Sequence, residues 1–252
     1  KNKKELSVAT GTNSAAFSAD YSYYINTYQS ATTPSVFTLH DAKTAAVLKQ
    51  LKDNTDLASK VAGYKMSKKE FSTISVNGND LNMYTIKPLD FDPSKKYPVL
   101  VYVYGGPHAQ MVTNSWLAGA NLWMHWMAEK GYLVYTVDNR GSANRGFEFE
   151  SVIHRQLGTV EMEDQLTGVK YLKSLKFVDT NRLAIHGWSF GGFMTTSMML
   201  RNAGVFNVGV AGGPVTDWKF YEIMYGERYM DMPSENPKGY EKASLLNYKN
   251  LG

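Results

Sequence analysis

The sequence predicts an α/β protein with a doubly wound, mainly parallel sheet, preceded by an all-β segment. From residue 97 onward, short apolar runs alternate with longer helical segments, which is the pattern of strands and helices in a parallel sheet. Before residue 63, short strands alternate with polar turns instead. A chain of 252 residues with 43% hydrophobic content is sufficient for a core of this kind.

Residues 1–63 are predicted to be all-β. Strands at 21–26 and 35–40 alternate with polar turns at 17–20 and 41–44. This rhythm is typical of β-propeller blades, and one blade cannot bury its faces alone. We therefore expect residues 1–63 to be the last part of a propeller domain whose other blades are missing, with an independent small β-sheet as the alternative.

Residues 64–252 are predicted to form the α/β domain. The turn residues 77–80 lie between two strand patterns and predict a hairpin at the edge of the sheet. The apolar run 97–104 reads as a strand covered on both faces. The remaining elements are expected as strands at 71–76, 81–86, 132–138, 182–186 and 207–211, and as helices at 121–130, 160–175, 190–202 and from Asp217 onward.

Composition excludes several classes of function. The formal net charge is +4, and the only basic clusters are 1–4 and 67–69, so nucleic-acid binding is not expected. The absence of cysteine excludes disulfides and thiol chemistry. No run is long and apolar enough to span a membrane, and no residues have the spacing of a metal or phosphate site. We expect no cofactor. The N-terminus lacks an apolar signal core, so Lys1 is expected to begin a fragment.

The segment Gly187–Gly191 has the Gly-x-Ser-x-Gly pattern of a nucleophile elbow. A strand-like run leads into it and a helix-like run leads out, as the motif requires. Glycines suit the flanks because the turn is too tight for side chains, and this leaves Ser189 exposed at a helix N-terminus. Hydrolases with this elbow order their triad as Ser, acid, His. All five histidines here precede Ser189, so its expected base is missing.

Two further features of the sequence predict functional residues beside Ser189. The segment Val103–Pro107 closes an earlier strand, and the loop there is where such hydrolases hold an oxyanion donor. Trp218, Tyr221 and Tyr225 have offsets of three and four residues, which would place them on one helical face lining a small apolar pocket.

The motifs VYVYGGPHAQ, DNRGSANRG, RQLGTVEMEDQ, GWSFGG and GPVTDWKFYEIMYGERYM resemble the prolyl oligopeptidase family in its dipeptidyl peptidase IV branch. Bacterial dipeptidyl and prolyl tripeptidyl aminopeptidases are the most similar members. The resemblance runs from about Phe17 to the last residue. It implies a β-propeller followed by an α/β-hydrolase domain that here lacks its C-terminal part, and a homodimer in the full-length protein.

The resemblance also implies roles for individual residues. Ser189 matches the acylating nucleophile, Tyr104 matches the side-chain oxyanion donor, and the backbone N–H of Phe190 would be the second donor. A flat aromatic slot suits a proline ring. The slot residues are Phe190, Val215, Trp218, Tyr221 and Tyr225. Phe190 departs from the tyrosine of many relatives, which should change the polarity of the slot more than the chemistry.

Other polar residues have structural interpretations. We expect His108 to make local hydrogen bonds and His186 to be a satisfied core histidine. Asp217 could act as a triad acid, but the family pattern favours an acid further along the chain. The remaining candidates are helix-starting carboxylates at Glu161, Glu163 and Asp164, core methionines at Met194, Met198 and Met199, structural arginines at Arg140 and Arg145, and a strand-end carboxylate at Asp138.

The sequence therefore predicts a serine aminopeptidase that releases N-terminal di- or tripeptides after proline through an acyl-enzyme. Its partners would be peptide substrates with proline near the N-terminus, and the family implies a periplasmic or cell-surface location. The alternatives are an inactive binding protein of the family, or an esterase or acylaminoacyl peptidase of the same fold. The 252 residues alone should be nearly inert, because the triad acid, the histidine and the glutamates that grip the substrate amine are expected outside them.

Overall fold

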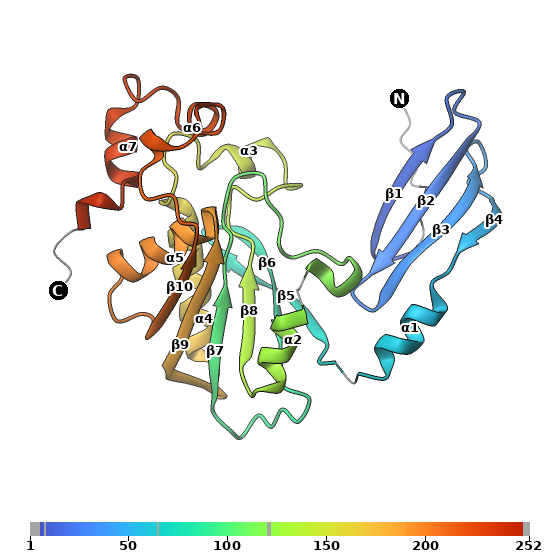
Figure 1. Ribbon diagram of the computed structural model, residues 1–252, viewed down its shortest axis with the longest axis horizontal. Coiled ribbons are helices and arrows are strands. Elements are labelled where there is room, and N and C mark those ends of the chain that lie inside the picture. The colour runs from blue at the N-terminus through green and yellow to red at the C-terminus, as the bar shows by residue number, and fades with distance from the viewer. Residues whose placement is uncertain (1–5, 8, 65, 120–121, 249–252) are drawn as a thin grey trace. The chain divides into compact units, whose positions relative to one another are not determined.

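The computed structural model describes residues 6–7, 9–64, 66–119 and 122–248 (Figure 1). The basic cluster at residues 1–4 and Asn121, the first residue of a predicted helix, lie outside the described residues. Two compact units make up the chain. One contains residues 1–69 and 113–125, and the other contains residues 70–112 and 126–252.

The first unit contains a four-stranded antiparallel sheet in the order β1-β2-β3-β4. This up-and-down arrangement is that of a propeller blade. The predicted strands lie within β2 and β3 except for Tyr21 and Ser22, which belong to the turn that Asp20 closes with Ser18 and Ser22 and in which Tyr21 has a φ of 57°. The elements are β1 Thr12–Phe17, β2 Tyr23–Ser30, β3 Thr33–Asp41, β4 Val47–Lys52, α1 Thr55–Ala62 and η1 Trp116–Gly119. The prediction that residues 1–63 are all-β is therefore wrong for 55–62, which form α1.

The second unit is built on a six-stranded sheet in the order β10-β9-β7-β8-β6-β5. Pairing is parallel between β7 and β8, β7 and β9, and β9 and β10, and it is antiparallel between β6 and β8. The strands are β5 Lys69–Val76, β6 Asn79–Ile86, β7 Tyr97–Tyr102, β8 Leu133–Val137, β9 Val178–Trp188 and β10 Val208–Gly212. This confirms the predicted doubly wound, mainly parallel sheet with a hairpin at its edge.

The helices predicted before β10 are present, and a further short helix at Phe147–Ser151 was not predicted. Beyond β10, the single helix predicted from Asp217 is wrong. The Asp217 carboxylate accepts a hydrogen bond from the Lys219 N–H and caps a short 3₁₀ turn, after which the chain is extended at Tyr221 and Glu222. The helices are α2 Leu122–Glu129, α3 Phe147–Ser151, α4 Val160–Ser174, α5 Phe190–Arg201, η2 Trp218–Phe220, α6 Ile223–Met230, α7 Pro237–Ala243 and η3 Leu246–Tyr248.

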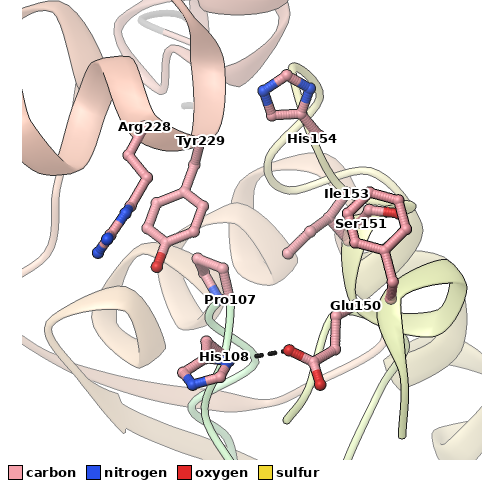
Figure 2. A pocket seen from close by; sticks show the side chains of 9 residues that line it. Pro107, His108, Glu150, Ser151, Ile153, His154, Arg228 and Tyr229 are labelled. Carbon is pink, nitrogen blue, oxygen red and sulfur yellow. Dashed lines mark hydrogen bonds and ion pairs between the residues drawn. The ribbon is translucent and has the colours of Figure 1, made fainter.

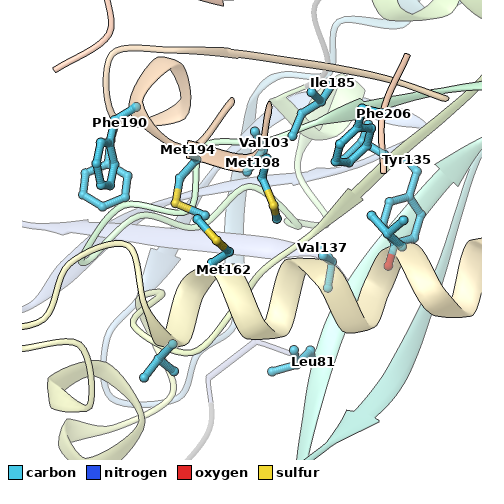
Figure 3. Packing of buried hydrophobic residues seen from close by; sticks show 14 of the residues in the cluster. Leu81, Val103, Tyr135, Val137, Met162, Ile185, Phe190, Met194, Met198 and Phe206 are labelled. Atoms are coloured by element: carbon cyan, nitrogen blue, oxygen red, sulfur yellow. The ribbon is translucent and has the colours of Figure 1, made fainter. Parts of the chain in front are cut away.

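The core of the second unit lies between the sheet and helices α4 and α5, which pack on β9. Figure 3 shows Met194 and Met198 of α5 beside Met162 of α4, and all three are buried in the same cluster. Flexible thioether chains fill irregular gaps between helices. The expected role of Met194 and Met198 as core filling is confirmed, and the rigid core holds the C-terminal ends of β7 and β9 together.

Candidate active site

Ser189 lies on a strained turn between β9 and α5. Its φ of 57° and ψ of −116° fall outside the regions that non-glycine residues ordinarily occupy. Hydrogen bonds on both sides hold this conformation: the Ser189 N–H donates to the Gly212 carbonyl at 2.9 Å, and the Ser189 carbonyl accepts from the Phe193 N–H at 3.0 Å. The turn has the geometry of a nucleophile elbow.

Glycines of the elbow pack directly against the end of β7. A Cβ on Gly187 would lie 2.3 Å from the Val103 carbonyl oxygen, and a Cβ on Gly191 would lie 2.2 Å from the same atom. A Cβ on Gly191 would also lie 3.1 Å from the Cα of Tyr104. The absence of side chains at these two positions therefore brings the backbone of Tyr104 against the first turn of α5.

The ring of Tyr104 lies beside Phe190. The two ring centroids are 6.1 Å apart, and Gly106 fits between them, since a Cβ there would be 2.7 Å from Tyr104 Cε1 and 2.9 Å from Phe190 Cγ. Burial raises the pKa of the Tyr104 phenol, with smaller contributions from Tyr221 and Tyr229. The hydroxyl therefore stays protonated at neutral pH and remains a hydrogen-bond donor.

Phe190 is the first residue of α5, so its N–H has no acceptor within the helix. A helix N-terminus carries a partial positive charge that favours an anion. The Phe190 N–H and the Tyr104 loop thus lie at the same end of the sheet as Ser189.

An aromatic cluster extends from Phe190. The ring of Trp218 lies 5.3 Å from Phe190 and stacks on Tyr225 at 5.7 Å with an interplanar angle of 13°. Tyr221 meets both Trp218 and Tyr225 edge to face, at 5.5 and 5.4 Å. Val215 is buried in the same core as Phe190 and Trp218. The five predicted slot residues thus belong to one connected group, with Phe190 from α5. Trp218, Tyr221 and Tyr225 do not share the predicted helical face, because Trp218 lies in η2, Tyr221 directly follows it and Tyr225 lies in α6.

A cavity of about 750 Å³ lies at the end of this cluster. Figure 2 shows Arg228 and Tyr229 of α6 on one wall, Glu150, Ser151, Ile153 and His154 on the opposite wall, and Pro107 and His108 between them. The ring of Tyr229 is 4.8 Å from that of Tyr225, so the cavity continues the aromatic cluster. The sequence reasoning missed Tyr229, although its spacing of four residues from Tyr225 could have indicated it.

His108, His154 and His186 interact with partners other than Ser189. His108 Nδ1 pairs with the Glu150 carboxylate at 2.9 Å on the cavity rim, and this bond lowers the pKa of Glu150. His186 Nδ1 lies 2.7 Å from the Val210 carbonyl oxygen, and His154 pairs with Asp231 at 3.3 Å. Each of these histidines has a partner that explains its position in the fold.

The remaining polar candidates have structural partners. Asp138 accepts backbone hydrogen bonds from Met111 and Val112, while its burial raises its pKa. Asp217 caps η2 and accepts a hydrogen bond from Ser244. The other contacts are a bidentate pair of Arg140 with Asp164 and a stacking of Arg145 over the ring of Phe149.

Among the residues that the structure describes, no group of three or more His, Cys, Asp or Glu side chains could hold a metal ion. No helix in the described part of the chain is long and apolar enough to cross a membrane.

The fold and the elbow define the class: a six-stranded sheet whose β9–α5 turn presents a serine is an α/β-hydrolase fold. Residues 120–251 match the model of the prolyl oligopeptidase family, and the chain belongs to this family.

Three similar proteins support this assignment. The solved structure of Porphyromonas gingivalis dipeptidyl peptidase 4 is 42% identical with a TM-score of 0.93, and the match covers 98% of this chain and 35% of that one. A structure from Bacteroides ovatus is 49% identical with a TM-score of 0.87, covering 95% and 34%. The "Probable dipeptidyl peptidase 4" of Aspergillus flavus is 37% identical over 236 residues, covering 92% and 30%. The chain thus spans about a third of the length of these relatives.

Proposed function

We propose that the full-length protein containing this chain is a serine exopeptidase that releases N-terminal di- or tripeptides after proline. The observation that carries the proposal is the packing of Tyr104 and Phe190 around Gly106 at the elbow of Ser189. This arrangement supports roles for Ser189 as the nucleophile, for the Tyr104 hydroxyl and the Phe190 N–H as hydrogen-bond donors, and for the neighbouring aromatic residues as the slot. The names of the similar proteins, which are dipeptidyl peptidases, support the same activity.

In the proposed mechanism, the Ser189 hydroxyl oxygen attacks the scissile carbonyl carbon and forms an acyl-enzyme after the amine leaves. The carbonyl oxygen becomes an oxyanion, to which the Tyr104 hydroxyl and the Phe190 N–H donate hydrogen bonds. Water then attacks the acyl carbon and releases the di- or tripeptide. The raised pKa of Tyr104 supports its role, because a donor must keep its proton at neutral pH.

The proton of Ser189 requires a general base. His40, His108, His154 and His186 hold hydrogen bonds to other groups, and His125 is buried in α2. We propose that the histidine and its acid come from a part of the full-length protein outside these 252 residues. The chain alone would then be nearly inert, because a serine hydroxyl without a base is a weak nucleophile.

The aromatic slot supports the preference for proline. The pyrrolidine ring is flat and has no N–H to satisfy, so it can pack against aromatic rings without an unpaired donor. Phe190, Trp218 and Tyr225 pack on one another with centroids 5.3 to 5.7 Å apart, so the pyrrolidine ring would pack against the edge of this group and not between its rings. The cavity beyond Tyr229 has room for the one or two residues that precede the proline.

The test is turnover of chromogenic anilides by the full-length protein. We expect hydrolysis of Ala-Pro and Ala-Ala-Pro anilides with a higher kcat/KM than for their Ala-terminated counterparts, and no turnover by the Ser189→Ala variant. Equal rates with proline and alanine would favour the esterase or acylaminoacyl peptidase alternative. A folded wild-type protein without turnover would favour the binding-protein alternative.

Two properties of the whole molecule belong to the same proposal. The resemblance to the family supports a homodimer and a location at the cell surface or in the periplasm. Light scattering on the purified full-length protein measures the first, and cell fractionation measures the second. A monomer or a protein confined to the cytoplasmic fraction would contradict them.

A further inference from the structure

Glu161 is a carboxylate with no exposed surface in the first turn of α4. Both of its oxygens lie 3.1 Å from the N–H of Gly158, and Oε2 also accepts from the N–H of Thr159 at 3.1 Å. Within the described residues it has no ion pair with Lys, Arg or His. A buried charge satisfied only by backbone donors is costly, so its place in the fold calls for an explanation.

The residues that Glu161 binds belong to a segment that we term the strap, residues 155–159. The strap is fastened to the end of α6: the Arg155 N–H donates to the Tyr229 carbonyl at 2.7 Å, and the Leu157 N–H contacts the Met230 sulfur at 3.4 Å. Tyr229 in turn packs on Tyr225 of the slot. The strap therefore determines where the last turn of α6 lies.

The strap also touches α5 directly behind the elbow. A Cβ on Gly158 would lie 2.6 Å from the ring of Phe193, so this ring packs against the strap backbone. The Phe193 ring lies 5.3 Å from both Phe190 and Trp218. The strap thus contacts the slot from two sides, through Phe193 and through Tyr229, and Glu161 is the side chain of α4 that holds it.

We propose that Glu161 is a positioning residue for substrate binding: its carboxylate fastens the strap, and the strap fixes the aromatic slot beside Ser189. The proposal rests on the proposed function for its substrate, but the attachment of the strap itself does not depend on turnover. Glu161 touches no substrate in this scheme and acts through Gly158, Phe193 and Tyr229.

The attachment depends on ionisation. A protonated carboxyl presents one acceptor oxygen fewer to the two N–H groups, so the strap is held more loosely. Burial raises the pKa of Glu161 to about 7, with a smaller contribution from Asp164 of the same helix. Two groups on the neighbouring helices also face this region. Tyr225 of α6 interacts electrostatically with Glu161, and the Arg201 guanidinium of α5 donates a hydrogen bond to the Gly158 carbonyl at 3.1 Å. The strap is therefore fastened above neutral pH and loosened below it.

The first experiment measures hydrogen exchange at the Gly158 and Thr159 amides of the wild-type full-length protein between pH 6 and pH 8, corrected for the intrinsic pH dependence of exchange. We expect protection to be about tenfold lower at pH 6, because protonation weakens these two bonds. Equal protection at both pH values would overturn the proposal. This readout needs no substrate, so it separates a failure of the strap from a failure of the proposed peptidase activity.

The second experiment compares Glu161→Gln with Glu163→Gln, an exposed carboxylate two residues further along the same helix. For an anilide substrate with proline, we expect the KM of the wild type and of Glu163→Gln to rise below pH 7. For Glu161→Gln, KM should be about tenfold higher at pH 8 and should no longer vary between pH 6 and pH 8. A Glu161→Gln variant with the wild-type KM profile would overturn the proposal, whatever the absolute turnover.

Discussion

Gly191 faces the Val103 carbonyl so closely that a Cβ would lie 2.2 Å from its oxygen. The contact joins the helix that follows Ser189 to the strand that precedes Tyr104. Two segments almost ninety residues apart in the sequence are thereby held within backbone contact. The relative position of Ser189 and Tyr104 depends on this approach.

Replacing Gly191 with Ala should destabilise the fold and separate the two segments. The added methyl meets a backbone oxygen that cannot move without disturbing β7, so we expect a loss of about 1–3 kcal/mol in unfolding free energy, as for overpacking in cores. Gly226→Ala in α6 is the matched control, because its Cβ would find only ordinary contacts, at 3.6 Å from the Trp218 carbonyl oxygen and 3.7 Å from the Tyr240 hydroxyl. Denaturant unfolding of both variants measures the difference, and equal stability would contradict the role of Gly191.

Replacing Tyr104 with Phe should lower kcat and leave KM nearly unchanged. The variant keeps the ring that packs on Phe190 but loses the hydroxyl that we propose as the donor to the oxyanion. Removal of one such donor typically costs about 10²- to 10³-fold in kcat. Steady-state kinetics on the full-length protein checks this, with Tyr171→Phe on the exposed face of α4 as the control. A change in KM with an unchanged kcat would contradict this and would place Tyr104 in substrate binding only.

Replacing Tyr225 with Ala should reduce the preference for proline. The ring stacks on Trp218 at 5.7 Å, and its loss opens one wall of the slot. Contacts of this size in an apolar pocket are worth about 1–3 kcal/mol, which corresponds to a 10- to 200-fold change in specificity. The ratio of kcat/KM for proline and alanine substrates is the measurement. Tyr225→Phe keeps the stacking face and should retain the wild-type ratio, whereas an unchanged ratio in Tyr225→Ala would exclude the slot.

The buried Glu161 should make the stability of the fold depend on pH. Its pKa is about 7 in the folded chain, compared with the ordinary value of 4.5 expected in the unfolded chain. Between these values the folded state binds more protons than the unfolded state, so the unfolding free energy falls as pH rises through this window. The loss attributable to Glu161 should be about 3 kcal/mol.

Denaturant unfolding at pH 4.5 and pH 7.5 tests this, with the wild type compared with Glu161→Gln. Other carboxylates titrate in both proteins, so the pH dependence that differs between them belongs to Glu161. The same slope in both would contradict the assignment. At high pH the fold loses unfolding free energy while the strap is held more tightly. These two effects are compatible, because the cost of burying the Glu161 charge is larger than the gain from the hydrogen bonds that the charge accepts.

The periodic elements could be predicted from the sequence. Apolar runs of strand length and the Gly187–Gly191 elbow indicated β7, β9 and α5, since buried parallel strands have few alternative patterns. The segment after β10 could not be read in the same way. A helical spacing of Trp218, Tyr221 and Tyr225 suggested one helix, whereas the 3₁₀ turn that Asp217 caps ends at Phe220 and the chain is extended at Tyr221 and Glu222 before α6 begins.

The contacts that assemble the site were also outside the reach of local patterns. The carboxylate Glu161 was expected at a helix start, which is correct, but its burial depends on a strap that only the tertiary structure brings to α6. The cavity beyond Tyr229 depends on α3 and the Pro107 loop, which are far from α6 in the sequence. Long-range packing of this kind carries no periodic signal.

The most direct test of the central claim is the reaction of the full-length protein with a fluorophosphonate probe, followed by peptide mapping. The account predicts one covalent adduct, located on Ser189, and none on the Ser189→Ala variant. Because the probe requires an activated serine, labelling also reports a working base and oxyanion site. A folded full-length protein that takes no label, or takes it at another serine, would contradict the assignment of Ser189 as the nucleophile.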